Sequence, residues 1–142
     1  MATVSKEVLI EANAEDVWAV VGDFATGPSR MAPGFVVDTR VEADHRVVTF
    51  ADGTVVRERL ISIDHDTRRI AYSVVGGSVQ PDHDNASMRV VAEGEGRCRL
   101  VWLRDVLPDA LAAPMGAAMA QGLDVTRRAF DDTREPRSGS RG

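Results

Sequence analysis

Apolar and polar residues alternate with a period of two over the central part of the chain, from Phe35 to Leu107. Valine and isoleucine dominate this region, and such alternation is typical of half-buried β-strands. Turn-forming sequences such as Asp52-Gly53 and the segment 93–96 interrupt it at regular intervals, which favours a meander of antiparallel strands. We predict strands at 4–11, 35–43, 46–51, 54–63, 69–75, 85–92 and 97–107.

Helical spacing replaces this alternation near the N-terminus. Asn13 is a suitable N-cap, with Asp16 as an imperfect capping box, for a first helix whose apolar face includes Trp18 and which ends at Gly22. The segment 24–33 is interrupted by glycine and proline, so it has room for a short second helix or a loop.

A long helix is predicted at 114–132, because apolar residues including Met115 and Met119 recur there on one face. This helix is rich in glycine and alanine, which leaves two alternatives open: close approach to the sheet, or space left beside it. The residues 134–142 are poor in apolar side chains and predict a disordered tail. The order of elements predicts an α+β fold with a seven-stranded curved antiparallel sheet around the C-terminal helix.

Length and composition narrow the class of protein. A chain of 142 residues is expected to form a single domain, here over 1–133, and the net charge of −5 argues against a nucleic-acid partner. The single cysteine, Cys98, excludes an internal disulfide, and no signal peptide or membrane span is recognisable. We therefore expect a cytoplasmic protein.

No motif for a metal or another cofactor is recognisable, and we expect none. Asp-His-Asp occurs at 64–66 and 82–84, but both copies lie in predicted turns, where aspartate forms local hydrogen bonds. Cys98 stands between two arginines that could lower its pKa, yet no partner histidine for nucleophilic catalysis can be identified.

Several strings resemble the START-related SRPBCC superfamily, and within it the polyketide cyclase/dehydrase-like branch. They are Ala14-Glu15-Asp16-Val17-Trp18, Arg57-Glu58-Arg59-Leu60, Arg69-Ile70-Ala71-Tyr72-Ser73-Val74, Asn85-Ala86-Ser87-Met88-Arg89-Val90 and Val101-Trp102. The resemblance covers residues 3 to 132 and rests on the order and spacing of these strings. It implies the helix-grip fold, with a cavity between sheet and long helix that takes hydrophobic or amphipathic small molecules.

The resemblance leaves the chemistry open, since some members are carriers or sensors and others cyclise or dehydrate polyketides. The sequence departs from the family at Met31-Ala32-Pro33, where an aromatic residue is usual, so the cavity entrance is not defined. The stretches 58–60 and 72–77 are also similar to plant abscisic-acid receptors of the same superfamily. That similarity implies that the residues facing the cavity include Glu58, Tyr72, Val74, Asn85 and Ser87. On strand 97–107, the superfamily similarity favours the face of Asp105 as the inward one.

Strand alternation supports an inward Glu58, because its two neighbouring arginines then face water. Beyond Leu60, however, Ile61 and Ile63 would fall on the water side. A bulge or bend near Ser62 would correct this.

We predict a ligand cavity with apolar walls and a few polar groups. Its candidate ligand-binding residues are Arg46, Phe50, Glu58, Tyr72, Asn85, Ser87, Asp105, Met115 and Met119. Arg89 is a further inward candidate, and Glu58 could be paired with Arg46 or Arg89.

Three functions remain possible for this cavity. The first is binding of a hydrophobic small molecule. The second is a cyclase or dehydrase in which Glu58 acts as base and Tyr72 or His83 as acid. The third is a protein-interaction module with a filled core, in which the polar groups only satisfy one another. Neither the ligand nor the oligomeric state can be read from the sequence.

Overall fold

The computed structural model describes residues 1–134 and confirms the predicted helix-grip architecture. The elements are β1 (Ala2–Ile10), α1 (Ala14–Val21), α2 (Gly27–Met31), β2 (Val36–Glu42), β3 (His45–Phe50), β4 (Val55–Asp64), β5 (Arg69–Gly77), β6 (His83–Ala92), β7 (Cys98–Leu107), the 3₁₀ turn η1 (Asp109–Leu111) and α3 (Ala112–Arg134). The long helix begins two residues earlier than predicted. It includes Arg134, which we had assigned to the tail, and the rest of that predicted tail lies outside the described residues.

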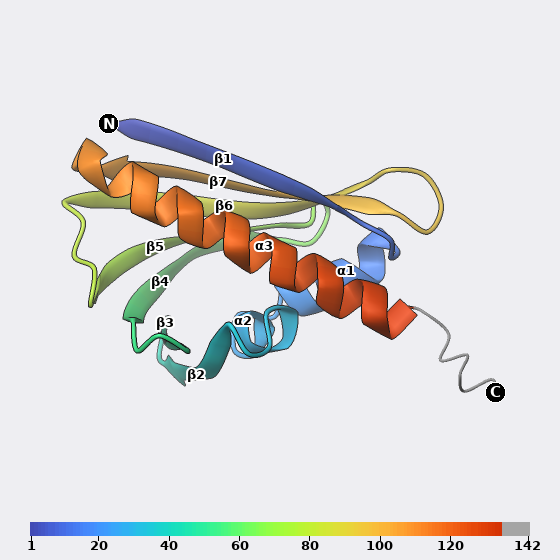
Figure 1. Cartoon of the computed structure of the whole chain (residues 1–142), viewed down its shortest axis with the longest axis horizontal. Coiled ribbons are helices and arrows are strands. Elements are labelled where there is room, and N and C mark those ends of the chain that lie inside the picture. The colour runs from blue at the N-terminus through green and yellow to red at the C-terminus, as the bar shows by residue number, and fades with distance from the viewer. Residues whose placement is uncertain (135–142) are drawn as a thin grey trace.

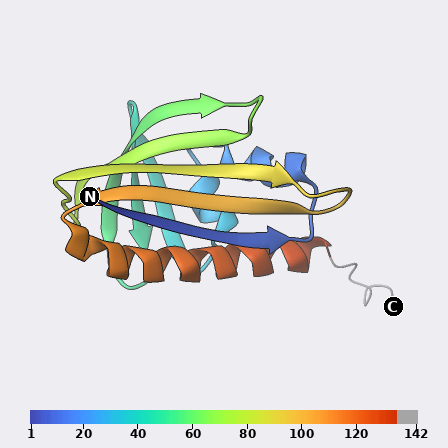
Figure 2. The same cartoon turned by 90° about the horizontal axis from the view of Figure 1, so that it is seen from above.

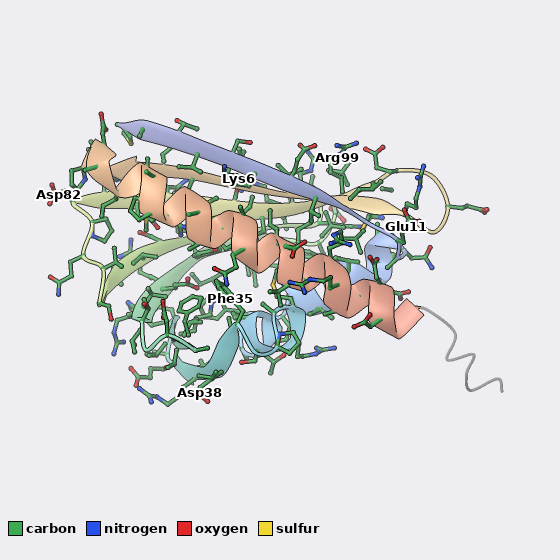
Figure 3. The ribbon with its side chains drawn as sticks, in the orientation of Figure 1. Lys6, Glu11, Phe35, Asp38, Asp82 and Arg99 are labelled. Atoms are coloured by element: carbon green, nitrogen blue, oxygen red, sulfur yellow. The ribbon has the colours of Figure 1, made fainter. Side chains whose placement is uncertain are left out.

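The seven strands form one antiparallel sheet in the order β1-β7-β6-β5-β4-β3-β2. Strands β2 to β7 are neighbours in chain order, as in a meander, and β1 completes the sheet by pairing with β7. The sheet curves strongly, and α3 crosses its concave side (Figure 1). Seen from above, α3 runs alongside β1 at one edge of the sheet (Figure 2). Charged side chains such as Asp38 and Asp82 extend outward from this framework (Figure 3).

Strand β4 contains the predicted bulge. The pairing of β4 with β5 shifts register between Leu60 and Ser62, so Ile61 is left out of the ladder and is 48% exposed. One additional residue returns Ile63 to the inner face, where it packs against the hydrophobic core. The bulge therefore allows Glu58 and Ile63 to point to the same side of the sheet.

Strand β5 is longer than predicted, because Gly76 and Gly77 continue it. Gly77 has a φ of 103°, and a Cβ atom at this position would lie 2.3 Å from the carbonyl oxygen of Val55. The glycine is required there by close approach of two backbones.

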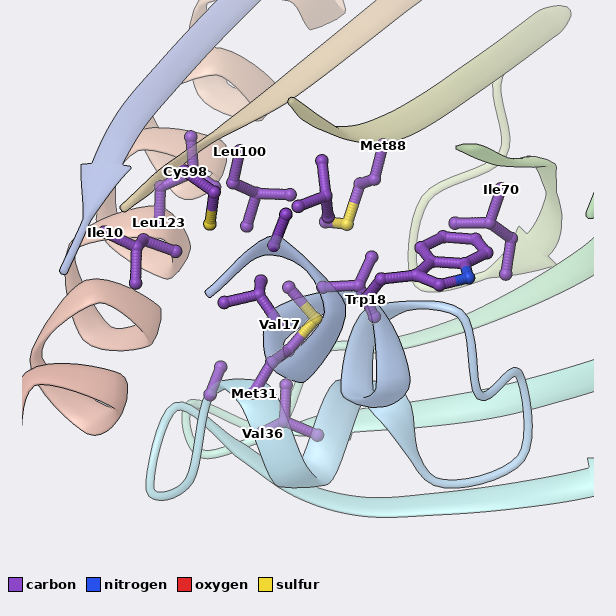
Figure 4. Close-up of a cluster of buried hydrophobic side chains, with 14 of the residues drawn as sticks. Ile10, Val17, Trp18, Met31, Val36, Ile70, Met88, Cys98, Leu100 and Leu123 are labelled. Carbon is purple, nitrogen blue, oxygen red and sulfur yellow. The ribbon is translucent and has the colours of Figure 1, made fainter. Parts of the chain in front are cut away.

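The apolar core lies at one end of the curved sheet, between the inner face and helices α1 and α2. Val17 and Trp18 of α1 face the inner side of the sheet, and the ring of Trp18 extends toward Ile70 (Figure 4). Asn13 occupies the N-cap position of α1 as predicted, but its side chain makes no capping bond and accepts a hydrogen bond from the backbone N–H of Gly96 instead (3.2 Å). Because the core side chains gather at this end of the sheet, fewer side chains fill the space beneath the N-terminal half of α3.

The glycines of α3 mark close contacts with neighbouring side chains. A Cβ atom on Gly116 would lie 3.3 Å from Val4, and one on Gly122 would lie 3.2 Å from Phe35. Ala118, by contrast, lines open space. Both alternatives for the small residues are thus realised, at different positions of the same helix. Within residues 1–134, no helix has the length and apolar character needed to cross a bilayer.

Candidate functional site

A cavity of about 380 Å³ lies between the concave face of the sheet and α3. This volume is within the range of small-molecule sites, about 300–1,000 Å³. Its walls are mostly apolar and come from α2, the strands β2 to β7 and the helix α3. Met31 and Ala32, in the segment where the sequence departs from its relatives, form part of the wall beside α2.

Most of the predicted inward residues do line this cavity. The predicted inner faces of β3 and β5 are correct, and Met115 and Met119 of α3 also contribute. The predicted site residues that line the cavity are Arg46, Phe50, Glu58, Tyr72, Met115 and Met119. Their role in binding stays a prediction.

The inward orientation predicted for Asn85, Ser87 and Asp105 is wrong. The lining residue of β6 is Met88, and those of β7 are Trp102 and Arg104, so the neighbouring positions face the outer side of the sheet. Asp105 accepts a hydrogen bond there from the hydroxyl of Thr3 at 2.7 Å.

Arg89 and His83 also lie outside the cavity. Both are exposed, and Arg89 donates a hydrogen bond to the backbone carbonyl of Thr67 at 3.3 Å. His83 is therefore not positioned as an acid for a ligand in the cavity.

Glu58 forms a buried ion pair with Arg46, its direct neighbour across the ladder between β4 and β3. The Arg46 Nε lies 2.7 Å from the Glu58 Oε1, and the two side chains are only 5% and 9% exposed. Arg46 also donates a hydrogen bond to the carbonyl of Phe24, and its guanidinium carbon lies 4.6 Å from the centre of the Phe24 ring. The carboxylate expected in the cavity is thus present and is neutralised by a partner.

A second buried ion pair joins Asp84 of β6 to Arg104 of β7. The Arg104 Nε lies 2.7 Å from the Asp84 Oδ1, and the Asp84 side chain is fully buried. The other carboxylate oxygen, Oδ2, accepts a hydrogen bond from the backbone N–H of Val74 at 2.7 Å. The pairing of β5 with β6 runs only as far as Tyr72, so the carboxylate of Asp84 bonds to β5 where the ladder has ended.

Tyr72 lies within cation–π range of both guanidinium groups. Its ring centre is 5.0 Å from the guanidinium carbon of Arg46 and 5.9 Å from that of Arg104. Burial raises the pKa of Tyr72 above its ordinary value, and the negative charge of Glu58 acts in the same direction. The phenol is therefore neutral at physiological pH and can donate a hydrogen bond to a ligand.

The raised pKa predicts the behaviour of the folded protein in alkali. The unfolded chain loses the tyrosine proton near pH 10, but the folded chain retains it, so stability is complete below about pH 10 and falls as the pH rises further. Because Tyr72 is the single tyrosine, near-ultraviolet tyrosinate absorbance follows it directly. We expect this absorbance to appear at higher pH in native protein than in concentrated urea. Identical titration curves would contradict the burial of the phenol.

Two other side chains that could be reactive, Cys98 and His65, are held by burial or by a hydrogen bond. Burial raises the pKa of the Cys98 thiol to about 11, although the charge of Arg68 opposes this, so the thiol is protonated and unreactive at neutral pH. His65 accepts a hydrogen bond from the indole Nε1 of Trp18 at 3.1 Å. Among residues 1–134, no group of three or more His, Cys, Asp or Glu side chains is arranged to hold a metal ion.

Sequence reasoning missed Asp84, Arg104 and Trp102. Asp84 was assigned to a turn, although it belongs to β6. The superfamily similarity favoured the Asp105 face of β7 as inward, which left Arg104 and Trp102 out of the predicted site. The signal available was apolar periodicity, since Leu100, Trp102 and the buried Val106 share a face with Arg104.

A known protein family matches nearly the whole chain. The family described as polyketide cyclase / dehydrase and lipid transport matches residues 1–131. No curated protein matches this chain.

Solved structures share the fold at low sequence identity. XoxI from Bacillus cereus is 19% identical, with a TM-score of 0.83 over 96% of this chain and 100% of its own. The di-domain ARO/CYC protein BexL is 16% identical, with a TM-score of 0.76 over 96% of this chain and 48% of its own.

Norcoclaurine synthase from Thalictrum flavum, solved with dopamine and hydroxybenzaldehyde, is 19% identical, with a TM-score of 0.65 over 95% of this chain and 89% of its own. At these sequence identities the solved structures show a common fold, whereas the match to the family model shows membership of the family. The chain belongs to the polyketide cyclase/dehydrase and lipid transport family, in the polyketide cyclase/dehydrase-like branch of the SRPBCC superfamily.

Proposed function

We propose that this protein binds a hydrophobic or amphipathic small molecule in the cavity between the sheet and α3. The observation that carries the proposal is a cavity of about 380 Å³ with mostly apolar walls and a strip of polar groups at Arg46, Glu58, Tyr72 and Arg104. Apolar walls supply affinity, and a few fixed polar groups orient the ligand. The description of the family, which includes lipid transport, supports the same kind of ligand.

The state of the polar groups favours binding over acid–base catalysis. Glu58, the candidate base, is held by Arg46 at 2.7 Å, and Tyr72, the candidate acid, has a raised pKa. A general acid or base works best with a pKa near the operating pH. A cyclase or dehydrase using the same cavity remains the alternative that the family description supports.

The open cavity does not favour an interaction module with a filled core. The location of the protein in the cytoplasm, and the absence of a nucleic-acid partner or cofactor, stay predictions from the sequence.

A matched pair of variants on β5 tests the proposal. Val74 lines the cavity and is 4% exposed, whereas its neighbour Val75 lies on the opposite face and is 43% exposed. Val74→Phe adds volume inside the cavity, and Val75→Phe adds the same volume outside it. With Nile red as a fluorescent hydrophobic probe, we expect Val74→Phe to weaken binding by roughly tenfold or more and Val75→Phe to leave it unchanged.

The expected difference holds only if both variants fold. Overpacking costs about 1–3 kcal/mol, which is within the stability of an ordinary domain, and circular dichroism with urea unfolding checks this. Equal probe affinity in wild type and folded Val74→Phe would refute binding in the cavity.

A further inference from the structure

A second hollow, an outer groove of about 570 Å³, adjoins the cavity. It lies between the end of the sheet formed by β2 and β3 and the C-terminal half of α3. Gly34, Ala51, Val125 and Arg128 are among its lining residues. Phe35 lies on the side of α3 that faces β2 and β3 (Figure 3).

The groove and the cavity are contiguous. Phe35, Phe50, Asp52 and Gln121 line both hollows. The rings of Phe35 and Phe50 meet edge to face with centres 5.3 Å apart. Phe35 also lies against Gly122, where a Cβ atom would approach it to 3.2 Å. A ligand longer than the cavity would therefore extend past this aromatic pair into the groove.

The two compartments differ in charge. In the cavity, Arg46 and Arg104 are each neutralised by a buried carboxylate. At the junction, the exposed carboxylate of Asp52 accepts a hydrogen bond from the backbone N–H of Thr54 (2.9 Å), and it has no ion-pair partner among residues 1–134. The arginine of the groove, Arg128, is already paired with Asp124 at 2.9 Å.

We propose that the outer groove and the cavity form one elongated site for an amphipathic molecule with a cationic or hydrogen-bond-donating end. The apolar body fills the cavity, and the polar end lies in the groove beside Asp52. Because a single exposed carboxylate is screened by water, its contribution to selectivity is modest. The inference rests on the proposed function, since it needs the apolar body of the ligand to occupy the cavity.

Two amphiphiles with the same chain and opposite charge provide the test. At neutral pH n-decylamine is a cation and n-decanoate is an anion, and isothermal titration calorimetry measures the affinity of each. We expect wild type to bind the amine about twofold to fivefold more tightly, as for an exposed ion pair. Asp52→Asn should abolish this preference.

Asp64→Asn is the matched control. Asp64 is the exposed last residue of β4, and its carboxylate accepts hydrogen bonds from the backbone N–H groups of Asp66 and Thr67, but it lines neither hollow. Both variants change the net charge equally, so a preference that survives in Asp64→Asn and not in Asp52→Asn is local to the groove. A preference absent from wild type, or equal in all three proteins, overturns the inference.

Val74→Phe separates this failure from failure of the proposed function. If Val74→Phe loses both amphiphiles while Asp52→Asn has no effect, the cavity binds the chain but the groove does not select its end. If Val74→Phe binds both amphiphiles as wild type does, the cavity is not the site, and both proposals are refuted.

Discussion

Replacing Asp84 with alanine is expected to destabilise the folded protein by about 3–5 kcal/mol, as for other buried ion pairs that lose one partner. The substitution leaves Arg104 buried without a counter-charge and removes the acceptor for the N–H of Val74. An unsatisfied buried donor adds a cost of its own. Urea unfolding followed by circular dichroism measures the change in the free energy of unfolding.

Asp82→Ala is the control for this measurement. Asp82 lies two residues away on the same segment, but it is exposed and its carboxylate forms no ion pair with the described residues. We expect its effect to stay within about 0.5 kcal/mol, as for most surface substitutions. A similar free energy of unfolding for Asp84→Ala and Asp82→Ala would contradict the structural role of the buried carboxylate.

The Arg46–Glu58 pair should show strong coupling in a double-mutant cycle. Glu58→Leu alone leaves Arg46 as an unpaired charge in a low-dielectric site and is expected to cost about 3–5 kcal/mol. The double variant with Arg46→Met and Glu58→Leu should recover most of this loss, because an apolar pair can replace a buried ion pair. The free energies of unfolding of wild type, both single variants and the double variant define the cycle.

An exposed ion pair offers the comparison. Arg57 and Glu42 lie 2.8 Å apart with side chains 42% and 41% exposed. Pairs of this kind contribute about 0–1 kcal/mol, so Glu42→Ala should change stability little. If Glu58→Leu were as mild as Glu42→Ala, the Arg46–Glu58 pair would not be the buried element that the structure describes.

Periodicity was sufficient to predict the strands, because one face of each is buried and the other meets water. On β4, the requirement that Glu58 and Ile63 share the inner face led to the bulge that the structure contains. On β3 and β5, alternation showed that Arg46 shares a face with Val48 and Phe50, and Tyr72 with Val74; the resemblance then placed Tyr72 and Val74 inward, and the structure agrees.

Reasoning from periodicity failed at β6 and β7, where each of two paired strands buries a charged residue. Arg104 and Asp84 neutralise each other, which makes their burial possible, but each alone is typical of an exposed position. Asp105 was predicted as an inward residue of β7 because the superfamily similarity favoured its face, and the structure turns the face with Arg104 inward instead. Whether two such charges lie next to each other depends on the register between their strands. Alternation along one strand does not reveal that register.

The outer groove could not be predicted for a different reason. Phe35 directly precedes β2 and Phe50 ends β3, so the two meet at the open end of the β2–β3 hairpin, and the helix residue Gln121 is distant from both in sequence. Their meeting depends on the curvature of the sheet and on where α3 crosses it. The departure at 31–33 indicated only that the entrance would differ from that of relatives.

Native mass spectrometry, after incubation with an organic extract of host cells, tests the central claim most directly. The account predicts that wild type and Val75→Phe retain a small molecule and that Val74→Phe, whose added ring takes up space in the cavity, is recovered largely as the bare polypeptide. Bare polypeptide in all three, or the same bound mass in Val74→Phe as in wild type, would contradict a ligand between the sheet and α3.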